Sequence, residues 1–223
     1  MITTIDPMKT PPISHFSAVI FDCDGTLVDS EPLALAAIEH EALALGVQPS
    51  ALADLHAMKG QSMASTLTTI AQRWGHPLPA DFEATVRARM AESFKTQLQP
   101  MPGALALLQQ LTIPYCVATN GPRAKTELTL SITGLLPLFQ GRIFSAYELG
   151  AFKPDPALFL HAASSIGVKP ERCVVVEDST AGVRAGLAAG MHVCVLRSQQ
   201  PLPADLQHHV RHLSSLEELL DKW

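Results

Sequence analysis

The feature of this sequence that most constrains its fold is an apolar run that ends abruptly in acidic residues. Residues 18–21 are all apolar, and the sequence Asp-Cys-Asp-Gly, which begins at Asp22, follows them directly. A short apolar run closed by a turn signal predicts a buried strand, here with acidic residues at its carboxyl end. Side chains two positions apart on a strand point the same way, so Asp22 and Asp24 can face one cleft. The alternative, a turn with two solvated aspartates, is disfavoured because the preceding run is so apolar.

The pairing of Asp22 with Asp24 suggests a bound cation. Two neighbouring carboxylates repel each other, and burying them is costly unless a positive charge lies between them. A divalent cation with oxygen ligands removes that cost, and Mg²⁺ is the natural candidate. A second acidic strand end, Glu177-Asp178, follows three consecutive valines and would supply further carboxylates. We therefore expect a Mg²⁺ site at these strand ends.

The rest of the chain divides into blocks by its pattern of apolar residues. Residues 1–15 contain three prolines and no apolar segment of signal-peptide length, so we expect a flexible tail there. Residues 32–99 favour helices almost throughout, whereas from 100 to 223 short apolar segments alternate with helical ones. This alternation predicts βαβ units and a parallel sheet, which is an α/β fold. In such sheets ligands bind beyond the carboxyl ends of the strands.

Apolar runs and helix start and stop signals give the expected elements one by one. Besides 18–21, strands are expected at 113–118, 142–145, 173–177 and 192–196. Helices are expected at 33–45, 50–57, 62–74, 81–95, 122–133, 155–166, 180–189 and 215–221. Three of these helices should be capped by Ser62, Asp81 and Asp155.

Two further segments could bind an anion. Thr119, Asn120 and Gly121 follow a predicted strand and precede a helix, where hydroxyl, amide and backbone N–H groups can surround a phosphoryl group. An ordinary turn is the alternative for this segment. Lys153 stands between an aromatic residue and a proline at a helix entrance, where a restricted backbone would fix its charge. The alternative for Lys153 is a solvated loop lysine.

The segment from Asp22 to Glu31, Asp-Cys-Asp-Gly-Thr-Leu-Val-Asp-Ser-Glu, resembles the first motif of the haloacid dehalogenase-like superfamily, in its phosphotransferase branch. Thr-Asn-Gly, Lys-Pro-Asp-Pro and Glu-Asp match the later motifs in the same order, and the resemblance runs from Ser17 almost to the end of the chain. It implies a Rossmann-like core made of residues 16–31 and 100–223, with a mobile helical cap, residues 32–99, inserted between the first two motifs.

The resemblance also implies roles for single residues. Asp22 would be the nucleophile that becomes an aspartyl-phosphate, and Asp24 the general acid and base. Lys153 and Thr119 would hold the transferring phosphoryl group. The implied metal ligands are Asp22, Asp24 through its backbone carbonyl, Asp178 and Glu177, the last directly or through water.

Substrate selection is expected in the cap, at a break between two predicted helices. The break combines a cation, a flexible glycine and a hydroxyl group, which suits an anionic or polyhydroxy part of a substrate. A solvated loop between helices is the alternative. The expected substrate-binding residues are Lys59, Gly60, Gln61 and Ser62 in the break, His56 and Arg87 elsewhere in the cap, and Asn120 and Gly121 in the core.

Charge and composition exclude several classes of partner. The net charge is −5 and no Lys/Arg cluster occurs, which argues against a nucleic-acid partner. No apolar run approaches 18 residues, so no membrane span is expected. The four cysteines lack C-x-x-C spacing and suit the core of a cytoplasmic protein. We expect a monomer or weak homo-oligomer. The sequence His208-His209-x-x-His212 has no accompanying acidic or cysteine ligand and is expected to be a solvated loop.

These expectations converge on a Mg²⁺-dependent phosphatase of a small phosphorylated metabolite, a sugar phosphate or sugar-acid phosphate. Within the superfamily, the motifs resemble those of bacterial sugar-phosphate phosphatases, and Ser/Thr-Asn-Gly-Pro with Lys-Pro-Asp-Pro-Ala is similar to the 6-phosphogluconate phosphatase subgroup. A phosphosugar isomerase like β-phosphoglucomutase shares every catalytic residue and remains an alternative. A non-catalytic regulator that binds a phosphometabolite is a further alternative, which the intact acidic set disfavours.

Overall fold

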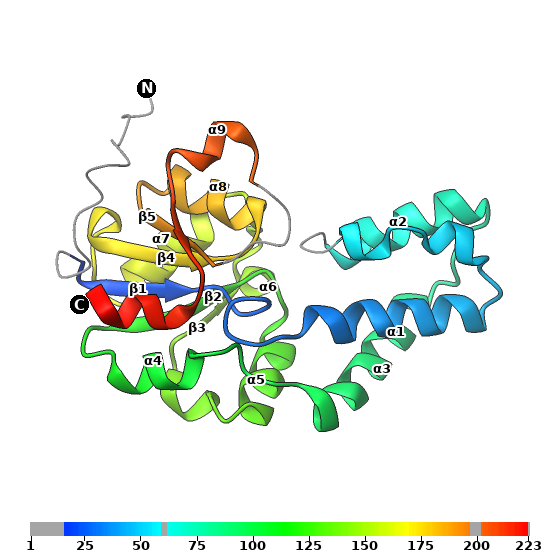
Figure 1. Cartoon of the computed structure of the whole chain (residues 1–223), viewed down its shortest axis with the longest axis horizontal. Coiled ribbons are helices and arrows are strands. Elements are labelled where there is room, and N and C mark those ends of the chain that lie inside the picture. Colours follow the sequence, from blue (N-terminus) through cyan, green and yellow to red (C-terminus); the bar gives the residue numbers. More distant parts are fainter. Residues whose placement is uncertain (1–15, 59–61, 197–201, 223) are drawn as a thin grey trace. The chain divides into compact units, whose positions relative to one another are not determined.

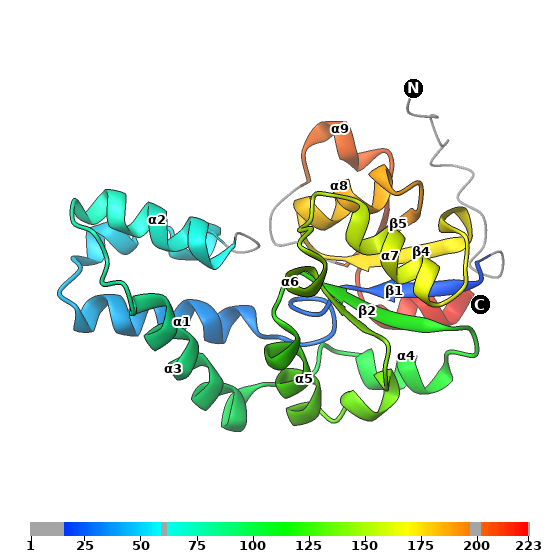
Figure 2. The ribbon, with the colours of Figure 1, turned by 180° about the vertical axis from the view of Figure 1, so that it is seen from behind.

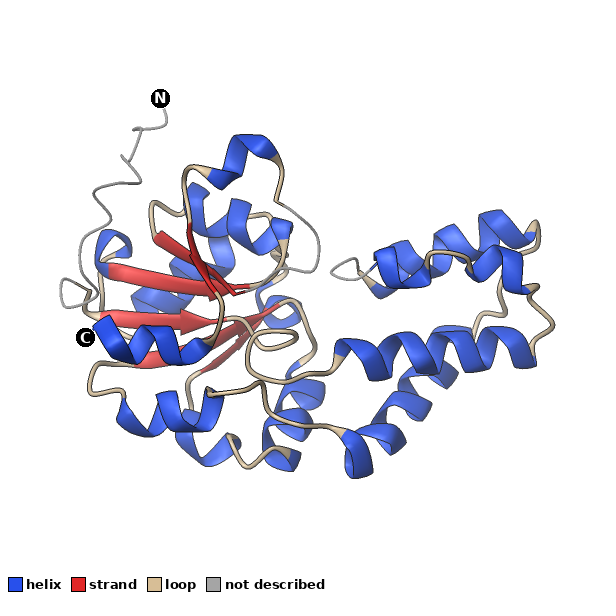
Figure 3. Cartoon of the chain, in the orientation of Figure 1, coloured by secondary structure: helices blue, strands red, loops and turns tan. Residues whose placement is uncertain are grey.

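A parallel sheet forms the centre of the larger part of the molecule. The computed structural model describes residues 16–58, 62–196 and 202–222. Within them, six strands pair in the order β3-β2-β1-β4-β5-β6, and every pairing is parallel (Figure 3). The strands are β1 (Ala18–Phe21), β2 (Tyr115–Thr119), β3 (Ile143–Ser145), β4 (Cys173–Glu177), β5 (His192–Leu196) and β6 (Arg211–Leu213). The predicted parallel α/β fold is confirmed.

Helices cover both faces of this sheet, which explains why its central strands are apolar without alternation. β1, β2 and β4 are buried along their whole length. On one face, α7 (Ala157–Ser165) packs against β1, β2 and β3, and α8 (Thr180–Ala188) packs against β4 and β5. The C-terminal 3₁₀ helix Leu216–Lys222 lies on the opposite face, in front of the sheet in Figure 1 and behind it in Figure 2, and packs against α4. The remaining helices of this part are α4 (Ala104–Gln110), α5 (Arg123–Ile132), α6 (Ala146–Leu149), α9 (Ala204–Gln207) and the 3₁₀ helices Leu136–Phe139 and Pro170–Arg172.

The contacts within the chain divide it into two compact units. One contains the residues up to Asp29 and from Gln99 onward, and the other contains Ser30–Leu98. The second unit is helical, with α1 packed along α3. Its described elements are α1 (Glu31–Ala44), the 3₁₀ helices Pro49–Leu52 and Leu55–Met58, α2 (Met63–Trp74) and α3 (Phe82–Gln97). Fully buried Ile70, Val86 and Phe94 belong to its core.

Several elements differ from the sequence-based predictions for identifiable reasons. The helix expected over 50–57 is instead two short 3₁₀ turns, because Asp54 between them has a left-handed φ of 60°, which an α-helix cannot contain. α4, α6, α9 and β6 were not predicted, and the final helix is 3₁₀ rather than α. His212, expected in a loop, lies on β6 with its side chain exposed.

Other predictions agree closely with the structure. β4 and β5 have the expected bounds, and Ser62 caps α2 by accepting a hydrogen bond from Ser65 N at 3.1 Å. Asp155 Oδ1 accepts a hydrogen bond from Ala157 N at 2.8 Å, one position before the N-cap of α7. Asp81 precedes α3 as expected, but its side chain makes no capping hydrogen bond. Within the described residues, no helix combines the length and the apolar character needed to cross a membrane.

Candidate active site

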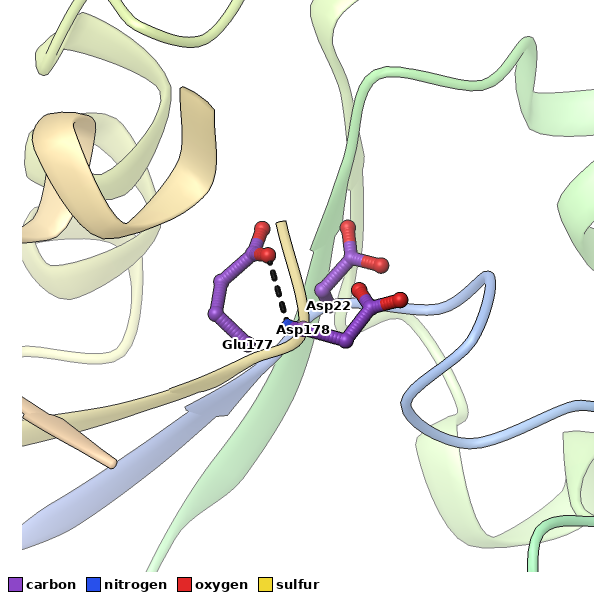
Figure 4. A group of neighbouring side chains, drawn as sticks. All are labelled: Asp22, Glu177 and Asp178. Carbon is purple, nitrogen blue, oxygen red and sulfur yellow. Dashed lines mark hydrogen bonds between the residues drawn. The ribbon is translucent and has the colours of Figure 1, made fainter. Parts of the chain in front are cut away.

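The carboxyl ends of the three central strands bring the acidic residues together. Asp22 directly follows β1, Thr119 ends β2 and Glu177 ends β4, and β1 lies between the other two strands. Parallel strands end at the same edge of the sheet, so three segments far apart in the sequence meet there. Figure 4 shows the carboxylate of Asp22 next to that of Asp178, which follows Glu177 in the chain.

Lys153 is the buried cation of this edge. Its Nζ lies 2.5 Å from Asp22 Oδ1 and 2.7 Å from Glu177 Oε1, and also 4.8 Å from the ring centre of Phe159. Burial alone would lower the pKa of Lys153, but the carboxylates of Asp22 and Glu177 raise it above its ordinary value. The ammonium is therefore held charged between two carboxylates.

For Asp22, the effect of burial on the pKa outweighs that of the neighbouring cation, Lys153. The pKa of the Asp22 carboxyl is raised to about 7, chiefly by burial and also by the charges of Glu177 and Asp24, although Lys153 lowers it. One lysine therefore does not compensate the negative charge around Asp22. An additional cation at this point would favour the ionised form of Asp22, which is the form that can act as a nucleophile.

Asn120 fixes the backbone that carries Lys153. Asn120 Oδ1 accepts a hydrogen bond from Lys153 N at 2.9 Å, and Asn120 Nδ2 donates one to Lys153 O at 3.3 Å. Asn120 was expected to contact the substrate, and that role stays a prediction. In the structure its amide is used to join the end of β2 to the lysine loop, a contact that sequence reasoning missed.

Glu177 is held by the N-terminus of α8. Its Oε2 accepts hydrogen bonds from Asp178 N, Ser179 N and Ser179 Oγ, each at 2.9 Å, and the first of these is drawn in Figure 4. A Cβ atom on Gly182 would lie only 1.8 Å from Glu177 Oε1, so the carboxylate occupies the space that this glycine leaves open. Both oxygens of Glu177 therefore have fixed partners, because Oε1 accepts a hydrogen bond from Lys153 Nζ.

A group of three carboxylates could hold a metal ion. Asp22, Glu177 and Asp178 each offer an oxygen, and these oxygens lie within 4.8 Å of one another. Gly25, with φ of 81°, makes room for Asp178, since a Cβ there would lie 2.1 Å from Asp178 Oδ2. Thr26 Oγ1 donates a hydrogen bond to Asp178 Oδ1 at 3.4 Å. Oxygen donors and excess negative charge are what Mg²⁺ prefers, so the residues fit this ion.

Thr119 and Gly121 form a tight turn before α5. Thr119 is buried, and its Oγ1 accepts a hydrogen bond from Gly121 N at 2.9 Å. Ser145 Oγ at the end of β3 donates to Gly121 O at 2.7 Å, which ties the turn to the next strand. The phosphoryl-binding role of both residues stays a prediction, now with a defined position at the sheet edge.

Lys125 is a second cation at this edge, and sequence reasoning missed it. Its Nζ forms an ion pair with Asp24 Oδ1, and 20% of the Lys125 side chain and 29% of the Asp24 side chain are exposed. Burial opposes the charge of Lys125, but Asp24 raises its pKa above the ordinary value. The sequence signal that could have identified Lys125 is its position in the first turn of the helix that follows Thr-Asn-Gly-Pro.

The structure describes only some of the cap residues that were expected to bind the substrate. Lys59, Gly60 and Gln61 lie outside the described residues, as does the side chain of His56. Ser62 is the N-cap of α2, and Arg87 pairs with Glu83 one turn earlier on α3, with its Nη2 2.6 Å from Glu83 Oε1. Their part in substrate selection stays a prediction.

Comparison with known proteins agrees with this arrangement. The family model for haloacid dehalogenase-like hydrolases matches residues 16–190. The 6-phosphogluconate phosphatase of Escherichia coli K12 is 35% identical over 211 residues, which cover 93% of this chain and 96% of that protein. Hexitol phosphatase A of the same organism is 34% identical over 189 residues, covering 82% of this chain and 84% of that protein.

A solved structure resembles the chain over a similar extent. A haloacid dehalogenase family hydrolase from Deinococcus radiodurans, solved with bound phosphate and sodium, is 32% identical. It superposes with a TM-score of 0.73 and covers 92% of this chain and 93% of its own.

Proposed function

The chain belongs to the haloacid dehalogenase-like hydrolase family and is a phosphoric monoester hydrolase, and we propose that it hydrolyses a sugar phosphate or sugar-acid phosphate through an aspartyl-phosphate on Asp22. The observation that carries this proposal is the set of contacts around Asp22. Lys153 joins Asp22 to Glu177, and Asp178 adds its carboxylate to theirs. A nucleophile, a fixed cation and a cation-binding carboxylate group are the parts that phosphoryl transfer needs.

In the first half of the reaction, a carboxylate oxygen of Asp22 attacks phosphorus. The bond from phosphorus to the ester oxygen breaks, and its electron pair passes to that oxygen, which takes a proton from Asp24 and leaves as an alcohol. Lys153 offsets the negative charge that builds up on the phosphoryl oxygens. Thr119 and the backbone N–H groups of the following turn donate hydrogen bonds to the same oxygens.

In the second half, a water molecule attacks the phosphorus of the aspartyl-phosphate. The bond between phosphorus and the Asp22 oxygen breaks, its electron pair returns to the Asp22 carboxylate, and Asp24 accepts a proton from the water. Inorganic phosphate is the second product. Each half therefore uses Asp24 in a different protonation state.

The ion that these residues would hold is Mg²⁺. Asp22 and Asp178 would bind it through carboxylate oxygens and Asp24 through its backbone carbonyl. Glu177 would act through water, because its two oxygens already accept four hydrogen bonds. Bound there, Mg²⁺ would neutralise charge on the phosphoryl group and orient it for in-line attack.

The relatives support the substrate class. Two of them are named for 6-phosphogluconate and for hexitol phosphates, which are phosphate esters of polyhydroxylated chains. We propose a leaving group of the same kind for this chain. Its selection is assigned to the segment from Lys59 to Ser62 together with His56 and Arg87, whose charges and hydroxyl suit a hydroxylated or anionic leaving group.

Phosphate release from a panel of phosphosugars tests the proposal. The panel should contain 6-phosphogluconate, hexitol phosphates and hexose phosphates, assayed with Mg²⁺ and wild-type enzyme. Asp22→Asn should fold but release phosphate at less than about a hundredth of the wild-type rate, because a neutral amide cannot form the acyl-phosphate. Activity of Asp22→Asn above that level would contradict covalent catalysis. Interconversion of hexose phosphates without phosphate release would instead identify a phosphomutase.

A further inference from the structure

Lys125 forms an ion pair with Asp24 at the edge of the sheet, and no step of the proposed reaction forms or breaks a bond at Lys125. We infer that Lys125 is a positioning residue for the second half of the reaction, in which it holds the Asp24 carboxylate ready to accept the proton of the attacking water. The inference rests on the proposed function, because it takes Asp24 as the general base. The observation behind it is the contact between Lys125 Nζ and Asp24 Oδ1.

The backbone of Lys125 is fixed relative to the sheet edge. Arg123, two residues before it, donates from Nη2 to Ile143 O at 2.6 Å and to Glu148 Oε2 at 2.7 Å. One residue after it, Thr126 is fully buried, and its Oγ1 donates to Pro122 O at 3.2 Å. The first turn of α5 is thus anchored on both sides of Lys125. An ammonium that projects from an anchored turn can set the orientation of a more exposed partner.

Asp24 is the partner that needs such a constraint. Its backbone is fixed by a bridge to Val28 and by the hydrogen bond from Gly25 N to Val28 O at 2.9 Å. Its side chain is 29% exposed, whereas that of Asp22 is 10% exposed and held by Lys153. A proton acceptor displaced by about 1 Å can lose about 100-fold in rate, so the orientation of this carboxylate matters.

The two halves of the reaction do not depend on Lys125 equally. An ammonium attracts and orients the ionised form of a carboxylate, and the ionised form is the one that accepts a proton from water. In the first half Asp24 instead carries the proton that it gives to the leaving oxygen. Loss of Lys125 should therefore slow the attack of water and the release of phosphate more than the formation of the aspartyl-phosphate.

Stopped-flow assays with p-nitrophenyl phosphate and Mg²⁺ separate these two steps. p-Nitrophenolate is a good leaving group and appears during aspartyl-phosphate formation, whereas steady-state turnover also needs its hydrolysis. Lys125→Met keeps the length of the side chain and removes its charge. We expect the kcat of this variant to fall about 10- to 100-fold, part of the range for general base catalysis, while kcat/KM changes less than about 3-fold. The p-nitrophenolate burst should not become smaller, and Lys125→Arg should recover part of the kcat.

Two further variants make the result decisive. Arg123→Met removes hydrogen bonds that anchor this turn of α5 but leaves the Lys125 ammonium in place, so it should lower kcat less than Lys125→Met does. Asp24→Asn should lower kcat at least as much as Lys125→Met, and Lys125→Met in that background should cause little further loss.

Three results would overturn the assignment of Lys125. They are an unchanged kcat in Lys125→Met, equal losses in kcat and kcat/KM, or an equal loss in Arg123→Met, which would mean that only the anchoring of α5 matters. If Asp24→Asn itself keeps full activity, the acid–base role in the proposed function is wrong, and the inference about Lys125 falls with it.

Discussion

Lys153 and Lys125 each bring an ammonium group to a carboxylate of the same short acidic segment, but their surroundings differ. Lys153 is buried, contacts Asp22 and Glu177, and has its backbone held by Asn120. Lys125 is partly exposed, and the ion pair seen for it is with Asp24. On the Lys153 side, the lysine contacts Asp22 and Glu177, and the carboxylate of Asp178 lies close to theirs, so negative charge exceeds positive charge among these four residues. On the Lys125 side, the ion pair that the structure describes joins one lysine to the Asp24 carboxylate, and this contact can orient that carboxylate.

Metal removal should produce the largest effect, because the carboxylates on the Lys153 side need an added cation to balance their charge. It therefore tests whether this side is short of positive charge. With excess chelator, phosphate release should be abolished, and Ca²⁺ should inhibit, since its larger coordination sphere can capture both oxygens of Asp22. Without any substrate, Mg²⁺ at 100 times its dissociation constant should stabilise the fold by about 2.7 kcal/mol and raise Tm accordingly. Asp178→Asn is the matched variant and should lose most of that gain. Full activity in chelator would refute the metal assignment.

Lys153→Met should reduce stability as well as activity. It leaves Asp22 and Glu177 buried without their cation, and breaking a buried pair in this way costs about 3–5 kcal/mol. Burial already raises the pKa of Asp22 to about 7 from 3.8, and loss of Lys153 raises it further. A proton on Asp22 then favours the folded state. The unfolding free energy of the variant should therefore be greatest at low pH and fall as the pH rises from about 4 to above 7.

Urea denaturation at pH 5 and pH 8, without metal, measures this dependence. If the unfolding free energy of Lys153→Met is lower than that of wild type by the same amount at both pH values, Asp22 remains ionised throughout, contrary to its raised pKa.

Lys125→Met should have the smallest effect on stability. Its ion pair is partly exposed, so solvent screens the interaction, and the loss should be about 1 kcal/mol or less. The control is Lys95→Met, which removes a more exposed pair with Glu92 on α3. If Lys125→Met were as destabilising as Lys153→Met in the same denaturation experiment, the contrast between the two lysines would be mistaken.

The strand ends were predictable from the sequence because each carries its own signal. The apolar run before Asp22 and the valines before Glu177 mark buried strands, and parallel pairing then brings their ends together. The capping role of Ser62 could also be predicted from the sequence, since an N-cap depends on neighbouring residues only.

Contacts between distant segments were not predictable in the same way. The use of the Asn120 amide on the Lys153 backbone depends on how two loops approach each other, which no local pattern encodes. Lys125 reaches Asp24 across 101 positions of sequence. α4 was missed because its residues, Ala-Leu-Ala-Leu-Leu-Gln-Gln, follow a Pro-Gly segment and end close to the next strand. Such a short helix has few start and stop signals of its own.

The space above Gly182 has a practical consequence for mutagenesis of this site. A single methyl group there would compete with Glu177 Oε1, an atom whose carboxylate is already held by four hydrogen bonds. Gly182→Ala would therefore push Glu177 away from Lys153 while leaving Asp22, Asp24 and Asp178 chemically untouched. Because the nucleophile Asp22 and the general acid Asp24 stay in place, such a variant would separate the contribution of the contact between Glu177 and Lys153 from that of the reacting carboxylates.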